Sequence, residues 1–128
     1  MFAPAAPRNI TDLALDQLLA RGIIAKRQNV KGSNVWGEKN KLAIHISSSI
    51  PVDLFSTEPD FWFNYLVCRT GGAENNRQIA AAANRKGWTW NPYRSGFTDD
   101  EGRLVRVNSE RDVFDLVGLP YRDPWDRI

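Results

Sequence analysis

The sequence contains few of the residues from which disulfide frameworks and histidine-based metal sites are built. Among its 128 residues are one cysteine, Cys68, and one histidine, His45. A single cysteine excludes an internal disulfide framework and is typical of a reducing compartment. A single histidine excludes a zinc site built on several histidines, and we expect His45 to be satisfied by neighbouring groups on a strand.

Long apolar runs are absent as well. No stretch approaches the length of a membrane span. The segment from Ala3 to Pro7 is rich in alanine and proline and lacks the apolar core of a signal peptide. We therefore expect a soluble, cytoplasmic protein with no membrane partner.

The chain does have enough apolar surface for a folded core. Hydrophobic residues make up 42% of it, and five residues are Trp, so the composition does not predict disorder. The length predicts one domain or two small packed subdomains. The net charge of +2 and the isoelectric point near 8.9 are compatible with a nucleic-acid partner without requiring one.

The most informative stretch begins at Arg69. A glycine turn, Thr70-Gly71-Gly72, opens a helix that ends at Gly87. Helical spacing gives this helix an apolar face of Ile79, Ala82, Ala83 and the stem of Lys86, and an opposite, small polar face of Asn76, Arg77, Ala80 and Asn84. The pattern alone favours an alanine-rich surface helix. The alternative is a helix that faces nucleic acid, with turn amides that donate to an anion.

Short strands and helices are expected on both sides of this stretch. Before it, we expect a helix that Asn9 or Thr11 caps and Gly22 ends, two adjacent strands at about 42–47 and 50–55, and a helix that Thr57 caps and Pro59 begins. The expected apolar residues of the two helices are Leu13, Leu15, Leu18 and Leu19 in the first, and Phe61, Trp62, Tyr65 and Leu66 in the second.

After Gly87 the sequence predicts a strand at 88–90, then a hairpin loop from Asp99 to Gly102 with a returning strand at 104–107. A short helix follows, with Ser109 as its cap, Asp112 in the position of a capping box, and Gly118 at its end. The tail after it is extended and punctuated by proline. This order of elements predicts an α+β fold.

Motifs at five positions carry a resemblance to a known family. They are Pro51-Val52-Asp53-Leu54, the turn at 70–72 with Asn76, Lys86-Gly87, Asn91-Pro92-Tyr93, and an ending that runs from Val107 to Asp115 and from Gly118 to Pro124. Together they resemble the C-terminal part of a family X, or polymerase beta-like, DNA polymerase. The similarity extends from about Lys31 to Arg127. It implies a small truncated palm-like sheet with a helix at residues 10–57, followed by a helical thumb with a β-hairpin at residues 58–128.

The resemblance also implies where catalytic groups belong. In the family, the palm carries three aspartates that bind two divalent metals for nucleotidyl transfer, and Asp53 matches the third. The other two belong upstream, as an Asp-X-Asp pair on a strand preceded by a Gly-Ser turn. The only acids before Asp53 are Asp12, Asp16 and Glu38, and Gly32-Ser33 lies after the position of that turn.

In-line phosphoryl transfer needs two metals held by several carboxylates. We therefore expect the isolated chain to be catalytically incomplete and to use no cofactor. Asp53 would bind Mg²⁺ only if a partner chain completed the site. The purified chain should then add no nucleotides with Mg²⁺ or Mn²⁺.

The thumb of the family holds the nascent base pair and the minor groove of the duplex. The residues expected to contact nucleic acid or nucleotide in this chain are Thr70, Gly71, Gly72, Asn76, Arg77 and Arg85. The chain departs from the family pattern at Cys68 and Arg69, where aromatic residues are usual, and at Ala80, where many members have a template-contacting arginine. These departures argue against nucleotide selection in the family's manner and leave weak contacts to the DNA backbone.

Cations and tryptophans admit two interpretations each. The cations Lys26, Arg27, Lys31, Arg77, Arg85 and Lys86 form either a phosphate-tracking surface or an ordinary solvated face. Trp62, Trp88 and Trp90 are expected in the core, with base stacking as the alternative for one of them. Cys68 is expected to be a packed thiol.

The leading hypothesis is a DNA polymerase X-like palm–thumb module that binds nucleic acid and is the C-terminal half of a split nucleotidyltransferase. The alternative is a repurposed, non-enzymatic regulatory module that binds a second protein chain, or itself, at the sheet edge containing Asp53. The missing acids argue against a third hypothesis, an autonomous minimal transferase.

Overall fold

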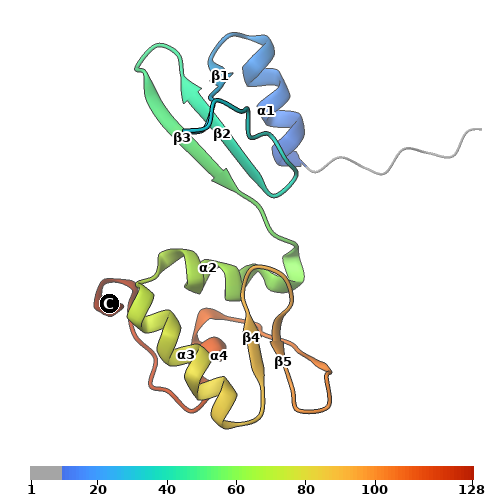
Figure 1. Ribbon diagram of the computed structural model, residues 1–128, viewed down its shortest axis with the longest axis vertical. Coiled ribbons are helices and arrows are strands. Elements are labelled where there is room, and N and C mark those ends of the chain that lie inside the picture. The colour runs from blue at the N-terminus through green and yellow to red at the C-terminus, as the bar shows by residue number, and fades with distance from the viewer. Residues whose placement is uncertain (1–9) are drawn as a thin grey trace, which may run out of the picture. The chain divides into compact units, whose positions relative to one another are not determined.

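The computed structural model describes residues 10–128, which divide after Ser56 into two units (Figure 1). Each unit has its own three-stranded antiparallel sheet, accompanied by one helix in the first unit and by several in the second, and this confirms the predicted α+β class. Asn9, one of the two expected helix caps, lies outside the described residues. Among helices in the described part of the chain, none combines the length and apolar character that crossing a membrane requires.

The first unit is a small sheet with one helix, α1 (Ile10–Ala20). The strands β1 (Ile24–Lys26), β2 (Asn40–His45) and β3 (Ile50–Phe55) lie in the order β1-β2-β3. The two expected strands correspond to β2 and β3. The sequence did not predict β1, because three residues are too few to show an alternating pattern. Gly22 has a φ of 70° after α1, as expected for a helix-ending glycine.

The core of the first unit is small. Its buried apolar residues are Leu15, Ile24 and Ala43, and the partly buried residues packed against them are Leu18, Leu19, Trp36, Val52 and Leu54. Leu13 was expected in the apolar stripe of α1, but it is 49% exposed. The stripe prediction is therefore wrong at Leu13, and only one turn of α1 reaches the core.

The outer edge of β3 follows from the hydrogen bonds of β2. The N–H of Leu42 donates to Val35 and its C=O accepts from Arg27, so both groups point toward the β1 side. Asp53 is opposite Leu42 in the register. Because backbone groups alternate along a strand, the N–H and C=O of Asp53 point away from β2. Pro51, which has no N–H, has the same orientation, a position that proline tolerates on an edge strand.

The second unit contains three helices and a short sheet. Its elements are α2 (Trp62–Thr70), α3 (Ala73–Arg85), β4 (Thr89–Asn91), β5 (Gly96–Thr98), β6 (Leu104–Val105) and α4 (Glu110–Asp115). The strands form an antiparallel sheet in the order β4-β5-β6. The loop from Asp99 to Gly102 joins β5 and β6, as predicted, and Gly87 ends α3 with a φ of 78°.

One core joins all these elements. Its buried residues are Val67, Cys68, Ile79, Ala82, Ala83, Trp90, Phe97, Val107, Val113, Phe114 and Val117. The predicted apolar face of α3 and the packed thiol of Cys68 are confirmed. Trp90 is 9% exposed and donates its indole N–H to Asn64 Oδ1 at 2.9 Å, and Trp88 packs against the same core. Trp62 is 47% exposed, so its expected place in the core is wrong.

The start of α2 corrects two further predictions. A 3₁₀ turn at Pro59–Phe61 comes first, with Glu58 at its cap position and no side-chain cap bond, and α2 itself begins at Trp62. Thr57 is therefore not the cap. The buried side of α2 consists of Asn64, Tyr65, Val67 and Cys68. Of the four expected residues, only Tyr65 is buried.

The end of the chain is held against α4. Ser109 Oγ accepts the N–H of Asp112 at 3.1 Å, which confirms the predicted cap. The Asp112 carboxylate accepts from the N–H of Asn108 rather than from Ser109 itself. In the tail, residues 119–123 form no helix or strand, and a 3₁₀ turn at Pro124–Asp126 follows them. Arg127 follows it, with a fully buried side chain that pairs with Glu110 at 3.0 Å.

Candidate nucleic-acid interface

The turn between α2 and α3 contains the predicted contact residues Thr70, Gly71 and Gly72. Gly71 has a φ of 76°, in the region that favours glycine, and the peptide bond between Gly71 and Gly72 is cis. The Thr70 hydroxyl donates to the Leu66 carbonyl at 2.7 Å, and the Gly71 N–H donates to the Val67 carbonyl at 3.1 Å. These two donors therefore complete the last turn of α2. The Gly71 amide, expected to donate to an anion, is thus already paired with a carbonyl of α2.

The chain's own tail covers the N-terminal end of α3. The C=O of Ile128 accepts the N–H of Asn75 at 2.6 Å. The backbone of Ile128 approaches Gly72 so closely that a Cβ added at Gly72 would clash with its carbonyl group. Gly72 is thus required for the close approach of another backbone, and that backbone is the tail rather than a nucleic-acid strand.

Asn76 links the two helices. Its Nδ2 donates to the carbonyl of Cys68 at 2.9 Å, while its Oδ1 is buried without a hydrogen-bond partner among the described residues. The neighbouring Asn75 is fully buried, and its Oδ1 accepts from Arg122 at 3.0 Å. Sequence reasoning missed Asn75, because its partner lies 47 residues away. Both asparagines hold the α2–α3 turn in shape.

The exposed face of α3 presents two of the predicted cations. The side chain of Arg77 is 73% exposed and pairs with Glu74 at 3.3 Å, and Arg85 is exposed. Ala80 is partly buried against the core, so it does not belong to the open polar face on which the sequence placed it. Lys86 donates to the carbonyl of Leu116 at 2.6 Å.

A guanidinium and two aromatic rings lie beside the turn. The guanidinium carbon of Arg69 is 5.3 Å from the ring centroid of Tyr65 and 5.2 Å from that of Tyr93. The two rings meet edge to face, with centroids 6.0 Å apart, and Arg69 Nη2 donates to Tyr65 Oη at 3.4 Å. We call these three residues the Arg69 clamp. Its i, i+4 half, Tyr65 with Arg69, was readable from the sequence, whereas Tyr93 joins from a distant turn.

The hydroxyl of Tyr93 has a perturbed acidity. Its hydrogen bond to Cys68 is the largest cause that raises the pKa of Tyr93, and the electrostatic interaction with Cys68 and burial add to it. The Arg69 guanidinium acts in the opposite direction. A tyrosine hydroxyl is protonated at neutral pH even at its ordinary pKa, and the shift of Tyr93 is upward, so the clamp carries one positive charge, from Arg69.

Asp53, the candidate metal ligand, is paired with a cation. Its Oδ1 lies 2.5 Å from Arg27 Nη2, and the two side chains are 47% and 28% exposed. Arg27 also donates to the carbonyl of Ala43 at 2.7 Å. Within residues 10–128 no group of three or more histidine, cysteine, aspartate or glutamate side chains is placed to hold a metal ion. Asp53 alone does not fit a magnesium site, because its carboxylate faces a guanidinium.

The remaining polar candidates are held locally. His45 Nδ1 lies 2.6 Å from Ser48 Oγ, and the expected satisfaction of this histidine by neighbours is confirmed. The ammonium group of Lys26 lies 5.2 Å from the ring centroid of Trp36.

The six cations predicted to track phosphates are divided between the two units. Lys26, Arg27 and Lys31 belong to the first unit, and Arg77, Arg85 and Lys86 belong to the second.

Comparison with known proteins identifies relatives of the second unit. Residues 65–128 match the family model described as DNA polymerase beta thumb. Over 71 residues the chain is 34% identical to DNA polymerase lambda of Rattus norvegicus. That alignment covers 48% of this chain but only 12% of the length of the relative. The similarity thus concerns the part of the chain that contains the α2–α3 turn, the Arg69 clamp and the buried Arg127.

Proposed function

The chain belongs to the DNA polymerase beta thumb family, and on this premise we propose that it is a nucleic-acid-binding module that holds DNA weakly through its sugar–phosphate backbone. The observation that carries the proposal is the family match over residues 65–128, which includes the turn at 70–72 and the exposed Arg77 and Arg85 of α3. Contacts to phosphates position a protein on DNA without selecting a sequence.

The expected affinity is low. The second unit has ten Lys and Arg against eleven Asp and Glu over residues 57–128, so its overall charge does not attract DNA. Binding then depends on a few local cations, and we expect a dissociation constant of about 1 μM or weaker. The logarithm of the binding constant should fall with the logarithm of salt concentration by about 0.9 for each phosphate contacted.

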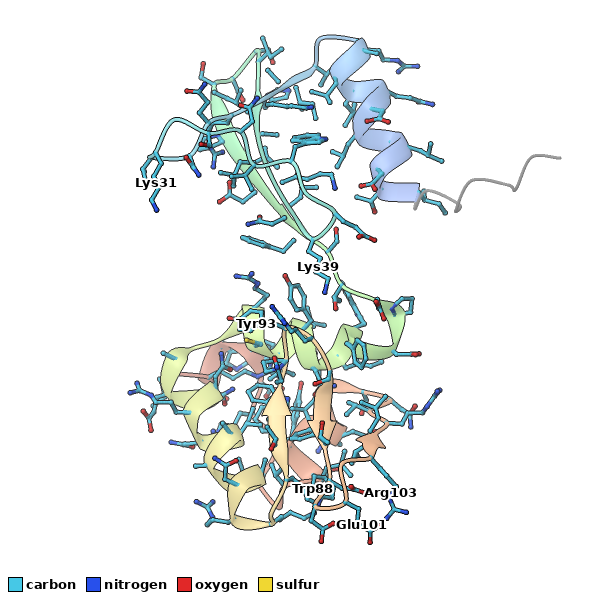
Figure 2. All side chains as sticks on the ribbon, turned by 45° about the vertical axis from the view of Figure 1, so that its right-hand side comes forward. Lys31, Lys39, Trp88, Tyr93, Glu101 and Arg103 are labelled. Atoms are coloured by element: carbon cyan, nitrogen blue, oxygen red, sulfur yellow. The ribbon has the colours of Figure 1, made fainter. Side chains whose placement is uncertain are left out.

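A titration with charge-reversal variants tests this function. Fluorescence anisotropy of a labelled gapped duplex would be followed at low salt for the wild-type chain, Arg77→Glu and Arg103→Glu. Arg103 is a matched control, because it lies at the end of the second unit opposite Tyr93 (Figure 2). Arg77→Glu should weaken binding several-fold for every sequence alike, and Arg103→Glu should not. No binding at low salt, or equal effects of both variants, would contradict the proposal.

We further propose that the isolated chain is catalytically incomplete. Two-metal phosphoryl transfer requires several carboxylates, and the pairing of Asp53 with Arg27 supports a remnant role for this residue. The purified chain should therefore extend no primer with Mg²⁺ or Mn²⁺. Extension that is lost in Asp53→Ala would overturn this proposal and favour a minimal transferase.

A partner chain could complete the site at the edge of β3. The outward backbone groups of Asp53 offer a strand partner one donor and one acceptor. We propose that the chain is the C-terminal half of a split nucleotidyltransferase whose other half adds a strand carrying the Asp-X-Asp pair. A neighbouring reading frame with a Gly-Ser turn and this pair would identify the other half, and its addition to the chain should produce Mg²⁺-dependent nucleotide transfer.

The same edge also supports the alternative function, a non-enzymatic interaction module. Ile50, at the start of β3, is 59% exposed, and the outward backbone groups of Asp53 offer hydrogen bonds to another strand. Sedimentation at high protein concentration separates the two cases. Self-association without any DNA binding would favour the interaction module, and a monomer that binds DNA would favour the polymerase-like module.

A further inference from the structure

We propose that Trp125 is the residue on which an unpaired nucleobase stacks beside the α2–α3 turn; this inference rests on the proposed DNA binding and adds a contact that does not involve phosphates. The ligand class is a base of single-stranded or gapped nucleic acid. Trp125 belongs to the 3₁₀ turn at Pro124–Asp126, and it is not among the tryptophans for which the sequence suggested base stacking.

Trp125 is the most exposed aromatic residue of the second unit. It is 80% exposed, compared with 51% for Tyr93 and 47% for Trp62. Trp88 and Trp90, by contrast, pack in the core of the unit. Single apolar residues at a protein surface are common, but an indole in water gives up the large apolar contact area that a tryptophan otherwise makes. Most of the Trp125 ring is therefore open to a ligand.

The backbone on both sides of Trp125 is held in place, so its exposure does not result from a frayed chain end. Pro124 restricts the backbone directly before it. Two residues after it, Arg127 has a fully buried side chain that donates to Glu110 at 3.0 Å and to the carbonyl of Arg122 at 2.9 Å. The fold therefore presents the indole to solvent at a fixed place.

That place is near the turn to which the proposed function assigns DNA. The C=O of Ile128 accepts the N–H of Asn75 at 2.6 Å, and the backbone of Ile128 lies against Gly72. Trp125 precedes Ile128 by three residues, and three residues span at most about 11 Å. Figure 1 shows the end of the tail beside the beginning of α3. A nucleic-acid strand held at this turn therefore has Trp125 within reach of its bases.

The charges beside the ring argue against a phosphate contact at this position. Asp123 and Asp126 flank Trp125 and are exposed, and their carboxylates repel a phosphodiester. Stacking does not require a positive charge, because every base offers a π face to an aromatic ring. We therefore expect Trp125 to add affinity without adding to the salt dependence of binding, whereas Arg77 of α3 should add to both.

The test follows the tryptophan emission of the full chain as octathymidine, a single strand, or a blunt duplex is added at low salt. Stacking of thymine should quench the emission of Trp125. Trp125→Leu should remove most of this quenching and weaken octathymidine binding about 10-fold, because stacking of one base on an aromatic ring has an effect of this order. Trp125→Phe keeps a ring and should lose only a few-fold.

Two further readouts distinguish stacking from other roles of Trp125. The salt slope of Trp125→Leu should equal that of the wild type, because no phosphate contact is removed. Its affinity for the blunt duplex should also be unchanged, because a blunt duplex offers no unpaired base. Joint substitution of Asp123→Asn and Asp126→Asn should raise the affinity for octathymidine about 2-fold by removing two negative charges beside the ring.

Trp62→Leu is the matched control. Trp62 is also exposed, but it lies at the end of α2 opposite the turn, so its substitution should leave octathymidine binding unchanged. Thermal unfolding of every variant would be measured in parallel, and binding would be compared below the lowest transition.

The outcomes separate this inference from the function on which it rests. If the wild-type chain binds neither DNA at low salt, both fail together. If it binds the blunt duplex but not octathymidine, or if Trp125→Leu binds octathymidine as tightly as the wild type, the function stands and the inference is wrong. An equal loss of affinity for the blunt duplex would also overturn stacking on a free base. Stronger quenching by a tetra-arginine peptide than by octathymidine would assign Trp125 and its flanking carboxylates to a cationic protein segment instead.

Discussion

The two units of this chain use similar elements but differ in how much apolar surface they bury. Among residues 10–128, the core cluster of the first unit contains three buried apolar residues, and that of the second contains eleven, from helices and strands alike. Twelve large hydrophobic residues are exposed in the part of the chain that the structure describes, and seven of them belong to the first unit: Ile10, Leu13, Ile23, Val30, Ile46, Ile50 and Phe55. The second unit therefore has a core that draws on both its helices and its strands, whereas the core of the first unit is small.

The distribution of positive charge differs from that of buried apolar residues, because the first unit has the larger excess of cations. Residues 1–56 contain seven Lys and Arg against four Asp and Glu, whereas residues 57–128 contain ten against eleven. The excess of positive charge therefore belongs to the first unit, although the family match lies in the second. Any binding of DNA by the second unit must come from the placement of particular cations rather than from net charge.

Expressing each unit alone should show the largest difference in stability between them. The isolated segment 57–128 should unfold cooperatively, because its core is contained within it, whereas the isolated segment 1–56 should show no cooperative transition. Domains of this smaller size rarely bury enough surface to be stable alone. Thermal unfolding followed by circular dichroism would check both segments. A cooperative transition in 1–56 would show that its three-residue core is sufficient.

The ion pairs of the two units should respond very differently to removal of one partner. Arg127 has a fully buried side chain that pairs with Glu110, while Arg27 and Asp53 are both partly exposed. Glu110→Ala leaves a buried charge without its partner and should cost about 2–4 kcal/mol of unfolding free energy. Asp53→Ala should cost less than about 1 kcal/mol. Urea unfolding of the full chain would measure the free energy of unfolding of both variants. Equal losses would contradict the expectation that the buried ion pair matters more than the exposed one.

Two glycine-to-alanine substitutions, one in each unit, compare how closely the backbone of each unit is packed. A Cβ at Gly72 would clash with the Ile128 carbonyl group, whereas a Cβ at Gly37 would lie 3.7 Å from its nearest atom, the Asn40 carbonyl oxygen. Gly72→Ala should therefore displace the tail and cost about 1–3 kcal/mol, with loss of hydrogen-exchange protection at Asn75. Gly37→Ala should be nearly neutral. Retained protection at Asn75 in Gly72→Ala would show that the tail is not anchored there.

The smallest expected effect is a pH dependence confined to the β5–β6 loop. The backbone N–H of Arg103 is the largest cause that lowers the pKa of Asp99, with a further backbone bond from Glu101. Because the folded-state pKa lies below the unfolded value, Asp99 stabilises the fold above its unfolded pKa and loses this effect as pH falls through the folded one. The stability difference between wild type and Asp99→Asn should thus shrink at acidic pH. A constant difference would contradict this role.

The sequence predicted the elements that have strong local signals. Ser109, Gly87 and the loop from Asp99 to Gly102 were each placed correctly, because caps, helix-ending glycines and hairpin loops depend on a few adjacent residues. The start of α2 was missed since Pro59 begins a 3₁₀ turn as readily as an α-helix. Trp62, the first residue of α2, is exposed, because the side of α2 that faces the core carries Asn64, Tyr65, Val67 and Cys68 instead.

The site was harder to predict, because its partners are distant in sequence. Arg27 and Asp53 are 26 residues apart, and Arg122 and Asn75 are 47 apart. Nothing local to Gly71, Gly72 or Asn76 indicates that the tail covers Asn75 or that α2 carbonyls take up the turn donors. The sequence therefore located the α2–α3 turn as the candidate site, but only the fold shows which of its hydrogen-bond donors already have partners within the protein.

The central claim, that the second unit holds DNA at the α2–α3 turn, is tested most directly by amide chemical-shift mapping. The 14.5 kDa chain, labelled with ¹⁵N, would be titrated with a short gapped duplex at low salt. The account predicts that the largest shift changes fall between Arg69 and Arg77, with smaller changes around Tyr93. Changes confined to the basic residues of the first unit, Lys26, Arg27 and Lys31, would contradict it.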